Sequence, residues 1–470
     1  MSTKHSEAAS CFISNKEGEA WHNKTLWMVR AKRDKIASEV PEWEALRELS
    51  NEIKMHTITN LDKYIEQFAQ NAEANGVEVH WAKDADEHNE IVYRILSDNK
   101  AKKLVKSKSM LTEECHLNEH LMSNGINVVE SDLGERILQL AGKAPSHIVM
   151  PAIHMTRQEV GKLFEEKLGT EKDNSDPTYL THAARQHLRN EFMTSDVGMT
   201  GCNFGVAETG DVVVCTNEGN ADMGTSLPKV HIVSMGIEKI IPNHKALSVY
   251  TRLLARSATG QPSTTYMSHF RKPPAGCKMH IIIVDNGRSN ILANAEHIQT
   301  LKCIRCGACM NTCPVYRRSG GYSYTYFIPG PIGINLGMLK EPRKYFDNVS
   351  ACSLCYSCNN VCPAKIDLAD QIYHWRQDLD NIGKADQMKK IMSKGMKFLF
   401  THPSLYKTSL KIAPLANGMP RFMVYNGLNQ WGQGREMPVF AKESFTTMWK
   451  QGKIQNTDES NYIEMTKNDE

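Results

Sequence analysis

Two copies of one cysteine pattern, CxxCxxCxxxCP, hold eight of the 13 cysteines in this 470-residue chain. The cysteines of the two copies are Cys303, Cys306, Cys309 and Cys313, then Cys352, Cys355, Cys358 and Cys362. Three cysteines at three-residue steps, with a fourth beside a proline, are typical of ligands to iron-sulfur clusters. The repeated pattern predicts two [4Fe-4S] clusters as cofactors and a function that transfers electrons.

The fourth cysteine of each copy is expected to bind the other copy's cluster, as it does in two-cluster ferredoxins. This crossover assigns the first cluster to Cys303, Cys306, Cys309 and Cys362. It assigns the second cluster to Cys313, Cys352, Cys355 and Cys358. The 38 residues between Cys313 and Cys352 must then fold back so that the two copies meet.

Disulfides and zinc explain the pattern less well than iron does. Disulfide frameworks belong to small secreted domains, whereas this chain is long and begins with the polar stretch MSTKHSEAAS in place of a signal peptide. Structural zinc sites use ligand pairs that are usually a dozen or more residues apart. The remaining cysteines are expected to be buried free thiols, which, like the clusters, fit a reducing cytoplasm. They are Cys11, Cys115, Cys202, Cys215 and Cys277.

The overall charge and hydropathy are those of an ordinary globular protein. The net charge is +3 and hydrophobic residues make up 41% of the chain. No apolar stretch approaches the roughly 18 residues that suggest a membrane span, and no nucleic-acid-binding motif is present. Within residues 303–365, seven basic side chains stand against only Glu341 and Asp347. This local positive charge either offsets anionic clusters or attracts an acidic partner.

The order of apolar and amphipathic segments predicts four parts. Residues 1–75 read as an N-terminal helical segment. Residues 76–290 read as an α/β domain with a largely parallel sheet, because short apolar runs alternate there with helical patterns. Residues 291–380 are expected to form an α-helical, ferredoxin-like domain with two [4Fe-4S] clusters, and residues 381–470 a small C-terminal region with a polar tail.

Within the α/β domain, apolar runs predict strands that begin near residues 77, 102, 126, 147, 231 and 279. Amphipathic segments predict helices near 84–99, 112–124, 156–168, 178–194 and 243–258. The runs FGVAETG and DVVVCTNEG predict a hairpin that turns at Gly210 and Asp211. The insert between the cysteine copies, SGGYSYTYFIPGPIGINLG, reads either as a flexible loop or as an ordered loop that faces a partner.

Polar turns in the α/β domain are the candidates for further chemistry. The chain has no GxGxxG dinucleotide motif and no P-loop, so two-electron chemistry needs another centre. Glu208 in AETG and Glu218 in TNEGN are candidate catalytic residues, although carboxylates in such turns are usually exposed. Lys106, Lys108 and Ser109 lie between a predicted strand and a predicted helix, where α/β sheets bind carboxylates and phosphates.

With cysteine motifs after an α/β domain, the chain resembles the L-lactate utilisation protein B family, the iron-sulfur subunit of the bacterial L-lactate oxidation complex. The resemblance rests on KSKSMLTEE, GMTGCNFGVAETG, TNEGN and LPKVHIVSMGIEKIIP, and on RRSGGYSYTYFIPGPIG between the cysteine copies. The first four segments resemble the family's LUD domain, whose fold is similar to the sugar isomerase and CoA-transferase class. The C-terminal region is also similar to that of the family.

The resemblance implies an electron-transfer subunit of a complex that oxidises L-lactate to pyruvate and supports growth on lactate. As one subunit of an L-lactate dehydrogenase complex, the chain would not be catalytic alone. The implied partners are a cysteine-rich subunit, a small LUD-domain subunit and an unidentified electron acceptor, with no nucleic acid. The implied location is the cytoplasm, peripheral to the inner face of the membrane through those partners.

Two other functions stay open at this point. The chain could be the electron-transfer subunit for another 2-hydroxy acid or for a glycerol phosphate dehydrogenase. Alternatively, it could bind lactate itself and act as a catalytic subunit that uses the α/β domain. Glu208 and Glu218 are the residues that the second of these functions would use.

Overall fold

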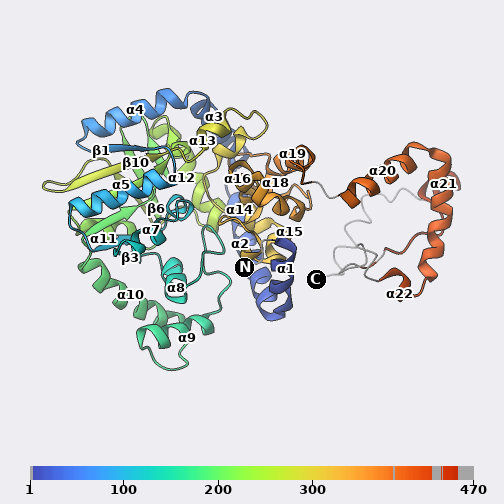
Figure 1. The fold of residues 1–470 in the computed structure, drawn as a ribbon, viewed down its shortest axis with the longest axis horizontal. Helices are drawn as coiled ribbons and strands as arrows, with labels where there is room; N and C mark the ends of the chain where they lie inside the picture. The colour runs from blue at the N-terminus through green and yellow to red at the C-terminus, as the bar shows by residue number, and fades with distance from the viewer. Residues whose placement is uncertain (1–3, 385–386, 426–435, 437, 454–470) are drawn as a thin grey trace. The chain divides into compact units, whose positions relative to one another are not determined.

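The computed structural model describes residues 4–384, 387–425, 436 and 438–453 (Figure 1). The chain divides into two compact units, Met1–Lys384 and Ala385–Glu470. Both cysteine motifs and all strands of the described residues belong to the first unit. In the described part of the chain, no helix combines the length and apolar character needed to cross a membrane. The four-part division expected from the sequence stays a prediction.

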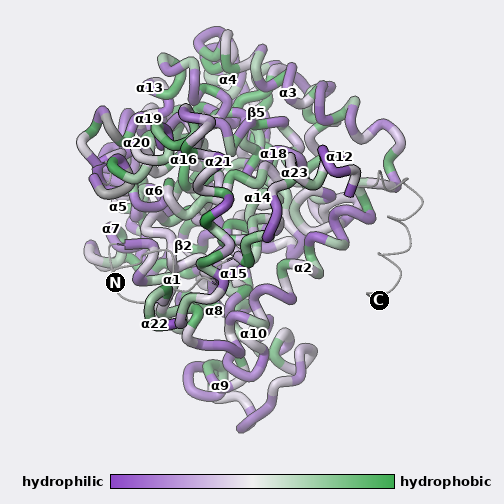
Figure 2. The backbone as a smooth tube through the Cα atoms, turned by 90° about the vertical axis from the view of Figure 1, so that its right-hand side faces the viewer, coloured by the Kyte–Doolittle hydropathy of each residue, from purple (hydrophilic) through white to green (hydrophobic). Residues whose placement is uncertain are grey.

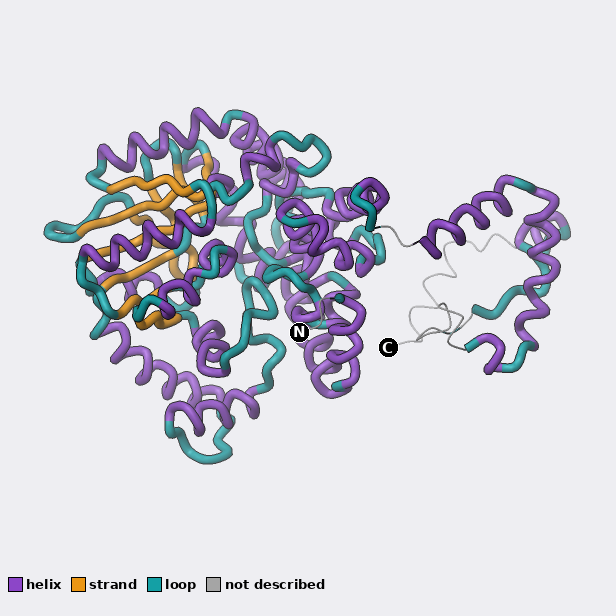
Figure 3. Tube along the Cα trace, in the orientation of Figure 1, coloured by secondary structure: helices purple, strands orange, loops and turns teal. Residues whose placement is uncertain are grey.

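A six-stranded parallel sheet forms the centre of the α/β region (Figure 3). The two longest strands, Val230–Gly236 and Lys278–Val284, are buried over nearly their whole length, which is typical of parallel strands covered on both faces. The α/β fold class is confirmed, as are the strands predicted near residues 77, 102, 126, 231 and 279. In order across the sheet the strands are β1 (Glu78–Ala82), β10 (Lys278–Val284), β7 (Val230–Gly236), β4 (Val197–Thr200), β2 (Lys103–Lys106) and β3 (Asn127–Glu130).

The strand order reverses between β2 and β4. From β2 the chain moves outward to the edge strand β3, whereas from β4 it proceeds the other way to β7 and then β10. Neighbouring parallel strands whose connections leave in opposite directions open a crevice at their carboxyl ends. The α/β region therefore has a natural ligand-binding position between the ends of β2 and β4.

The predicted hairpin is confirmed and belongs to a second, four-stranded sheet. The order of this sheet is β8 (Ile240–Ile241), β5 (Phe204–Val206), β6 (Asp211–Thr216) and β9 (Tyr266–Phe270). Gly210 makes the turn with a φ of +72°, and a Cβ there would lie 2.4 Å from the backbone nitrogen of Ala72. Only glycine meets both conditions without strain.

Helices cover the parallel sheet. Two sequence predictions for this region are wrong, one of a helix and one of a strand. The predicted helix at 112–124 is split at His116, whose φ is +53°. The predicted strand near 147 is a loop of bends and turns, although its Ile148 and Ile153 are buried. The helices of this region are α4 (Leu61–Ala74), α5 (Ala85–Asp98), α6 (Met110–Glu114), α7 (Leu117–Ser123), α8 (Leu133–Ala141), α9 (Arg157–Leu168), α10 (Pro177–Met193), α11 (Asn220–Ser226), α12 (His244–Thr259) and α13 (Arg288–Leu292).

The polarity of these helices follows their position. Figure 2 colours α9 largely as hydrophilic, and its sequence RQEVGKLFEEKL explains the colour. Helix α12, in contrast, buries Leu247, Tyr250 and Leu253. A helix that buries such a face belongs to the core and can carry fixed side chains toward a site.

The N-terminal helices pack on the cysteine-bearing region. They are α1 (His5–Ser14), α2 (Lys16–Ser38) and α3 (Trp43–Thr59). Helix α2 contacts both α14 (Ala308–Thr312) and α15 (Pro314–Ser319), and α1 contacts α15. Leu26 of α2 is fully buried in the same hydrophobic cluster as Cys309 and Cys358. The helical prediction for this segment is confirmed, and its packing explains why the segment carries apolar residues at helical spacing.

Short helices and loops form the cysteine-bearing region. The insert between the motifs is neither flexible nor partner-facing, because Tyr324, Tyr326 and Ile328 are buried in one cluster with Cys309 and Cys358. The insert is the hydrophobic core of this region. Its helices, besides α14 and α15, are α16 (Gly330–Lys340), α17 (Pro342–Tyr345), α18 (Ser357–Val361) and α19 (Leu368–Asn381).

The second unit is helical where it is described. Its helices are α20 (Gln387–Thr401), α21 (Pro403–Ile412), α22 (Arg421–Val424) and α23 (Phe445–Lys450). Large apolar side chains are exposed on it, among them Phe398, Phe400 and Leu415. The predicted polar tail falls mostly on residues 454–470, outside the described residues.

Candidate functional site

The structure brings the eight motif cysteines into two neighbouring groups. Four of them line one small cavity, and the other residues of its wall include no His, Asp or Glu. We call these four the first thiol group: Cys303, Cys306, Cys309 and Cys362. Cys313, Cys352, Cys355 and Cys358 form the second thiol group, in which the pKa of the Cys358 thiol is raised by burial and then by the three others. The cluster that each cysteine binds stays a prediction.

The two motif loops repeat one backbone conformation. The residue before the second cysteine is left-handed in both copies, with φ values of +59° at Arg305 and +54° at Leu354. The residue after the second cysteine is also left-handed, with +75° at Gly307 and +60° at Tyr356. These turns reverse the chain at each three-residue step. They let successive thiols point to one centre.

Backbone N–H groups point at the sulfur atoms of both groups. Arg305 N lies 3.4 Å from Cys303 Sγ, and Leu354 N lies 3.3 Å from Cys352 Sγ in the equivalent position. The N–H of Ile366 donates to Cys362 Sγ at 3.4 Å. Such donors stabilise thiolates, and in iron-sulfur proteins they also tune the reduction potential.

The surroundings of Cys309 and Cys313 favour their neutral thiol forms. Burial, reinforced by the neighbouring thiols, raises the pKa of Cys309 well above its usual value. Burial raises the pKa of Cys313 to about 11. Four thiolates could coexist here only with a cation among them, since a coordinating metal deprotonates its thiol ligands. Soft sulfur donors in an apolar wall fit iron-sulfur clusters.

Arginines from distant segments bind the backbone of the cysteine loops. Arg47 of α3 donates from Nε to the carbonyl oxygen of Cys362 at 3.0 Å, and Arg33 of α2 donates to Val361 at 3.2 Å. On the other side, Arg376 of α19 donates to the carbonyl oxygens of Val349, at 3.2 Å, and Cys352. The motif pattern gives no signal for these residues, because they lie outside it.

A second cavity, of about 510 Å³, lies in the α/β region. Its wall includes residues that follow β2, β3 and β4, so it occupies the crevice expected where the strand order reverses. The wall also includes Arg305 and Cys306 of the first cysteine motif. We call it the strand-end cavity. It borders the first thiol group directly.

The predicted anion-binding residues divide between the core and this cavity. Lys106 is fully buried and bound to Glu130, with 2.7 Å between Nζ and Oε1, so the expectation that it meets a ligand is wrong. Lys108 and Ser109 line the strand-end cavity. Lys108 Nζ donates to the carbonyl oxygen of Val149 at 2.9 Å and lies 3.8 Å from Asp132.

The two candidate glutamates do not lie in the same site. Glu218 lines the strand-end cavity, and its Oε2 accepts a hydrogen bond from the backbone N–H of Leu133 at 3.1 Å. Burial, with the nearby Asp132 carboxylate, raises the pKa of Glu218 to about 7. Glu208 is exposed and lies outside the wall of the cavity. Of the two, only Glu218 is placed to meet a ligand there.

The scattered cysteines follow the prediction only in part. Cys115 is buried, whereas Cys202, Cys215 and Cys277 are partly buried. Cys11 is exposed on α1, and the expectation that it is buried is wrong. Burial raises the pKa of both Cys115 and Cys202 to about 12, so these two thiols are unreactive at neutral pH.

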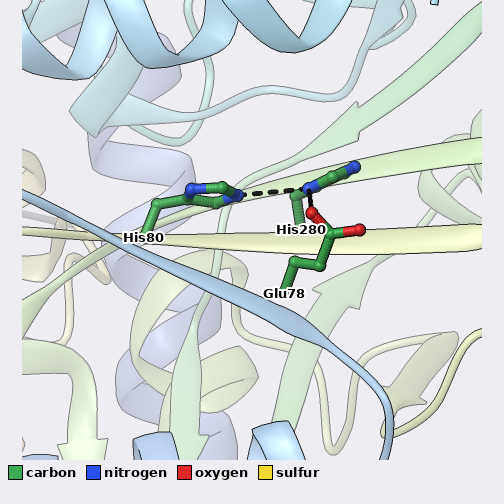
Figure 4. A group of neighbouring side chains, drawn as sticks. All are labelled: Glu78, His80 and His280. Carbon is green, nitrogen blue, oxygen red and sulfur yellow. Dashed lines mark hydrogen bonds and ion pairs between the residues drawn. The ribbon is translucent and has the colours of Figure 1, made fainter.

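One group of polar side chains lies on the edge of the parallel sheet, on β1 and β10 (Figure 4). His80 Nε2 is 3.1 Å from His280 Nδ1, and Glu78 Oε2 is 3.3 Å from the same nitrogen. His280 Nε2 is buried and has no hydrogen-bond partner among the described residues, and none of the three side chains lines the strand-end cavity. Sequence spacing missed this group because it joins two strands 200 residues apart.

Comparisons with known families agree with this division of the chain. The LUD domain family matches residues 65–291, and the 4Fe-4S dicluster domain family matches residues 299–366. A third family, described as lactate utilisation protein B, C-terminal, matches residues 379–454. The dicluster match covers both cysteine motifs.

Several relatives match most of the length of this chain. The chain is 41% identical to lactate utilization protein B of Macrococcus caseolyticus, over 91% of this chain and 92% of that protein. It is 42% identical to lactate utilization protein B of Oceanobacillus iheyensis, over 88% of this chain and 89% of that protein. An Escherichia coli K12 protein described as the uncharacterized electron transport protein YkgF is 39% identical over 91% and 92% of the two chains. The chain therefore belongs to the lactate utilization protein B family.

Proposed function

We propose that this protein is the iron-sulfur electron-transfer subunit of a complex that oxidises L-lactate to pyruvate and supports growth on lactate. The observation that carries the proposal is the pair of four-thiol groups in a chain that belongs to the lactate utilization protein B family. The protein takes up electrons from lactate oxidation and passes them to an acceptor outside this chain. It is not catalytic alone.

Each thiol group holds one [4Fe-4S] cluster. When bound, a cluster of this kind accepts and releases single electrons, at a potential set by its hydrogen bonds and burial. Cys303, Cys306, Cys309 and Cys362 hold the first cluster, and Cys313, Cys352, Cys355 and Cys358 the second. The apolar wall of the first group, together with the N–H donors to Cys303 and Cys362, supports this assignment.

Clusters held by the two groups would form a path on which electrons enter at the first thiol group and leave at the second. The first group borders the strand-end cavity through Cys306, which is 8% exposed. The second group includes Cys355, which is exposed. An exposed ligand lets a partner's redox centre approach closely, whereas a buried group exchanges electrons with a neighbour inside the protein.

The partners are a cysteine-rich subunit and a small LUD-domain subunit of the lactate utilisation complex. The complex works in the cytoplasm, peripheral to the inner face of the membrane through these partners. Its acceptor takes electrons from the second cluster. The support for these statements is the family to which the chain belongs.

Metal analysis of protein purified without oxygen tests the proposal first. The expected content is about eight iron and about eight sulfide per chain. Reduction of the clusters by L-lactate in the copurified complex, followed by electron paramagnetic resonance, tests the direction of electron flow. A zinc-loaded, iron-free chain would contradict the cofactor assignment. Normal growth of a deletion strain on lactate, with failure on another 2-hydroxy acid or on glycerol phosphate, would contradict the substrate.

A further inference from the structure

We propose that the strand-end cavity binds a small organic anion of the 2-hydroxy or 2-oxo carboxylic acid class, with its carboxylate between Lys239 and Arg305. The cavity would thus hold the substrate or product acid against the first thiol group. This inference deepens the proposed function, and the identity of the acid rests on that function. It assigns a ligand to the α/β region.

The position of the cavity is the first reason. It lies at the carboxyl ends of β2 and β4, where the strand order reverses, and such crevices are the usual ligand sites of open α/β sheets. It also borders Cys306 of the first thiol group. A ligand in this cavity is therefore placed beside the group through which electrons are proposed to enter.

Two cationic side chains with unused donors are the second reason. Lys239, on the 3-10 turn Ile237–Lys239, lines the cavity, and in the described part of the chain its ammonium group has no hydrogen bond or salt bridge. Arg305 also lines the cavity, and its buried Nη1 has no hydrogen-bond partner among the described residues. The unpaired buried donor of Arg305 is costly to leave without a partner, and the partly buried ammonium group of Lys239 adds positive charge, so both groups favour an anion.

The nearby carboxylates are already neutralised, which leaves these cations in excess. Arg288 binds Glu238, with 2.5 Å between Nε and Oε2, and Glu114, with 2.8 Å between Nη2 and Oε2. Arg305 Nη2 is 3.8 Å from Glu238, and Lys54 Nζ donates to the backbone oxygen of Glu238 at 2.6 Å. Beside the proposed carboxylate position, Glu238 and Glu114 thus stand against Arg288, Arg305 and Lys239, whereas elsewhere on the wall Asp132 and Glu218 stand against Lys108. An anionic cluster offsets part of this charge, so the test must separate a ligand from the cluster.

The remaining wall fits an organic acid better than an inorganic ion. The volume of about 510 Å³ lies within the range of small-molecule sites, about 300 to 1,000 Å³. Ile148, Val149 and Leu254 give the wall an apolar part. Glu218, on the same wall, has a pKa raised to about 7 by burial, so near neutral pH it is partly protonated and repels an anion less than an ordinary carboxylate would.

The experiment uses the full chain, prepared without oxygen and with its clusters loaded. L-lactate, pyruvate, acetate and inorganic phosphate are titrated separately by calorimetry, and dithionite-reduced samples are followed by electron paramagnetic resonance. We expect saturable binding of lactate or pyruvate and a changed signal from only one of the two clusters. Binding of phosphate alone would overturn the carboxylic acid assignment.

Three variants locate the site. Lys239→Gln is expected to weaken binding about tenfold or more, which matches the loss of one charge-assisted contact. Asn203→Asp adds a negative charge to the wall while it keeps the oxygen that accepts from the backbone N–H of Cys215, and it is expected to weaken binding as strongly. Lys245→Gln, at an exposed position on α12, is the matched control and should bind like the parent protein.

The possible results distinguish a failure of this inference from a failure of the proposed function. No binding heat and no spectral change, in a chain with about eight iron atoms that lactate still reduces in the complex, would overturn the inference alone. A chain without clusters, or clusters that lactate does not reduce in the complex, would overturn the proposed function. If Lys239→Gln lowers the iron content, the decision rests on Asn203→Asp, and unchanged binding in that variant overturns the inference.

Discussion

The two thiol groups share one sequence pattern and one loop conformation, yet they lie in different surroundings. The first group has three buried cysteines, Cys306, Cys309 and Cys362, and borders the strand-end cavity. The second group has a single buried cysteine, Cys358, and its Cys355 is exposed. A repeated motif thus specifies which cysteines come together, whereas the segments packed around each copy determine what each thiol group can reach.

The largest effect is expected when one cysteine is removed from either thiol group, because this tests the order of electron transfer. Cys306→Ala and Cys355→Ala should each lower the iron content from about eight to about four per chain, because each removes a ligand of one cluster. In the complex, lactate should still reduce the remaining cluster of Cys355→Ala. It should not reduce the remaining cluster of Cys306→Ala. Electron paramagnetic resonance after lactate addition measures both.

The opposite pattern would reverse the proposed direction of flow. If lactate reduced the remaining cluster of Cys306→Ala but not that of Cys355→Ala, electrons would enter through the second thiol group. Reduction by dithionite is the control, since it should reach the remaining cluster in both variants.

A second prediction concerns the arginines that hold the two loops. Arg47→Ala should lower the free energy of unfolding by about 3 kcal/mol, because it leaves the carbonyl oxygens of Cys362 and Asn359 without their donor. Arg376→Ala should cost about half as much, because Arg376 is only partly buried. Urea unfolding and the rate of iron loss to a chelator measure the two effects. Arg252→Ala, which removes an exposed ion pair with Glu42, should cost under about 1 kcal/mol.

Equal costs for Arg47→Ala and Arg376→Ala would contradict the difference in burial between the two groups. Iron loss should also be selective. Arg47→Ala should release iron from the first cluster sooner, and Arg376→Ala from the second, which their separate resonance signals distinguish.

The sequence predicts the elements whose signal is local. The grouping of the motif cysteines, the hairpin at Gly210 and five of the six expected strands follow from periodicity or spacing within their own segments. The strand predicted near residue 147 is wrong because this segment is apolar for another reason. Its Ile148 is buried against the first thiol group and does not pair with a strand. The loop prediction for the insert between the motifs is wrong for a different reason. Its glycines and tyrosines are typical of a loop, and only their packing with the cysteines in the folded chain buries them.

The sequence indicates only some of the residues that line the strand-end cavity. Lys108, Ser109 and Glu218 were identified because they follow strands, but Lys239 and Arg305 were not. Lys239 follows a 3-10 turn, and Arg305 lies inside a cysteine motif where its charge has another explanation. Convergence of such residues depends on tertiary contacts, which spacing along one chain does not encode.

The third prediction concerns the effect of low pH on His88, which contacts a residue in the wall of the strand-end cavity. His88 is buried, and its Nε2 lies 2.7 Å from the hydroxyl of Ser234, which lines the strand-end cavity. Burial lowers the pKa of His88 to about 4, from 6.5. Between these values the folded chain binds fewer protons than the unfolded chain, so stability falls as the pH falls. The loss due to His88 should be about 2 kcal/mol at pH 5.

Urea unfolding at pH 7 and pH 5 measures this loss, and comparison with His88→Gln isolates it from the other buried histidines. The variant should lose less stability between the two pH values than the parent protein. Acid should also alter the signal of the first cluster before that of the second. Equal pH dependence of variant and parent would show that His88 titrates normally in the folded chain.

The smallest effect is expected from the two left-handed positions that follow Cys306 and Cys355. Gly307→Ala should cost about 1 to 2 kcal/mol, because φ is +75° and the new Cβ would lie 3.1 Å from His147. Tyr356→Gly should change stability less than Gly307→Ala does. Relief of the left-handed strain offsets the lost hydrogen bond, of 2.7 Å, from Tyr356 to Asp370. Denaturant unfolding of both variants at fixed iron content checks the pair. A larger cost for Tyr356→Gly would mean that the exposed tyrosine, and not the buried glycine, is the more constrained of the two equivalent turns.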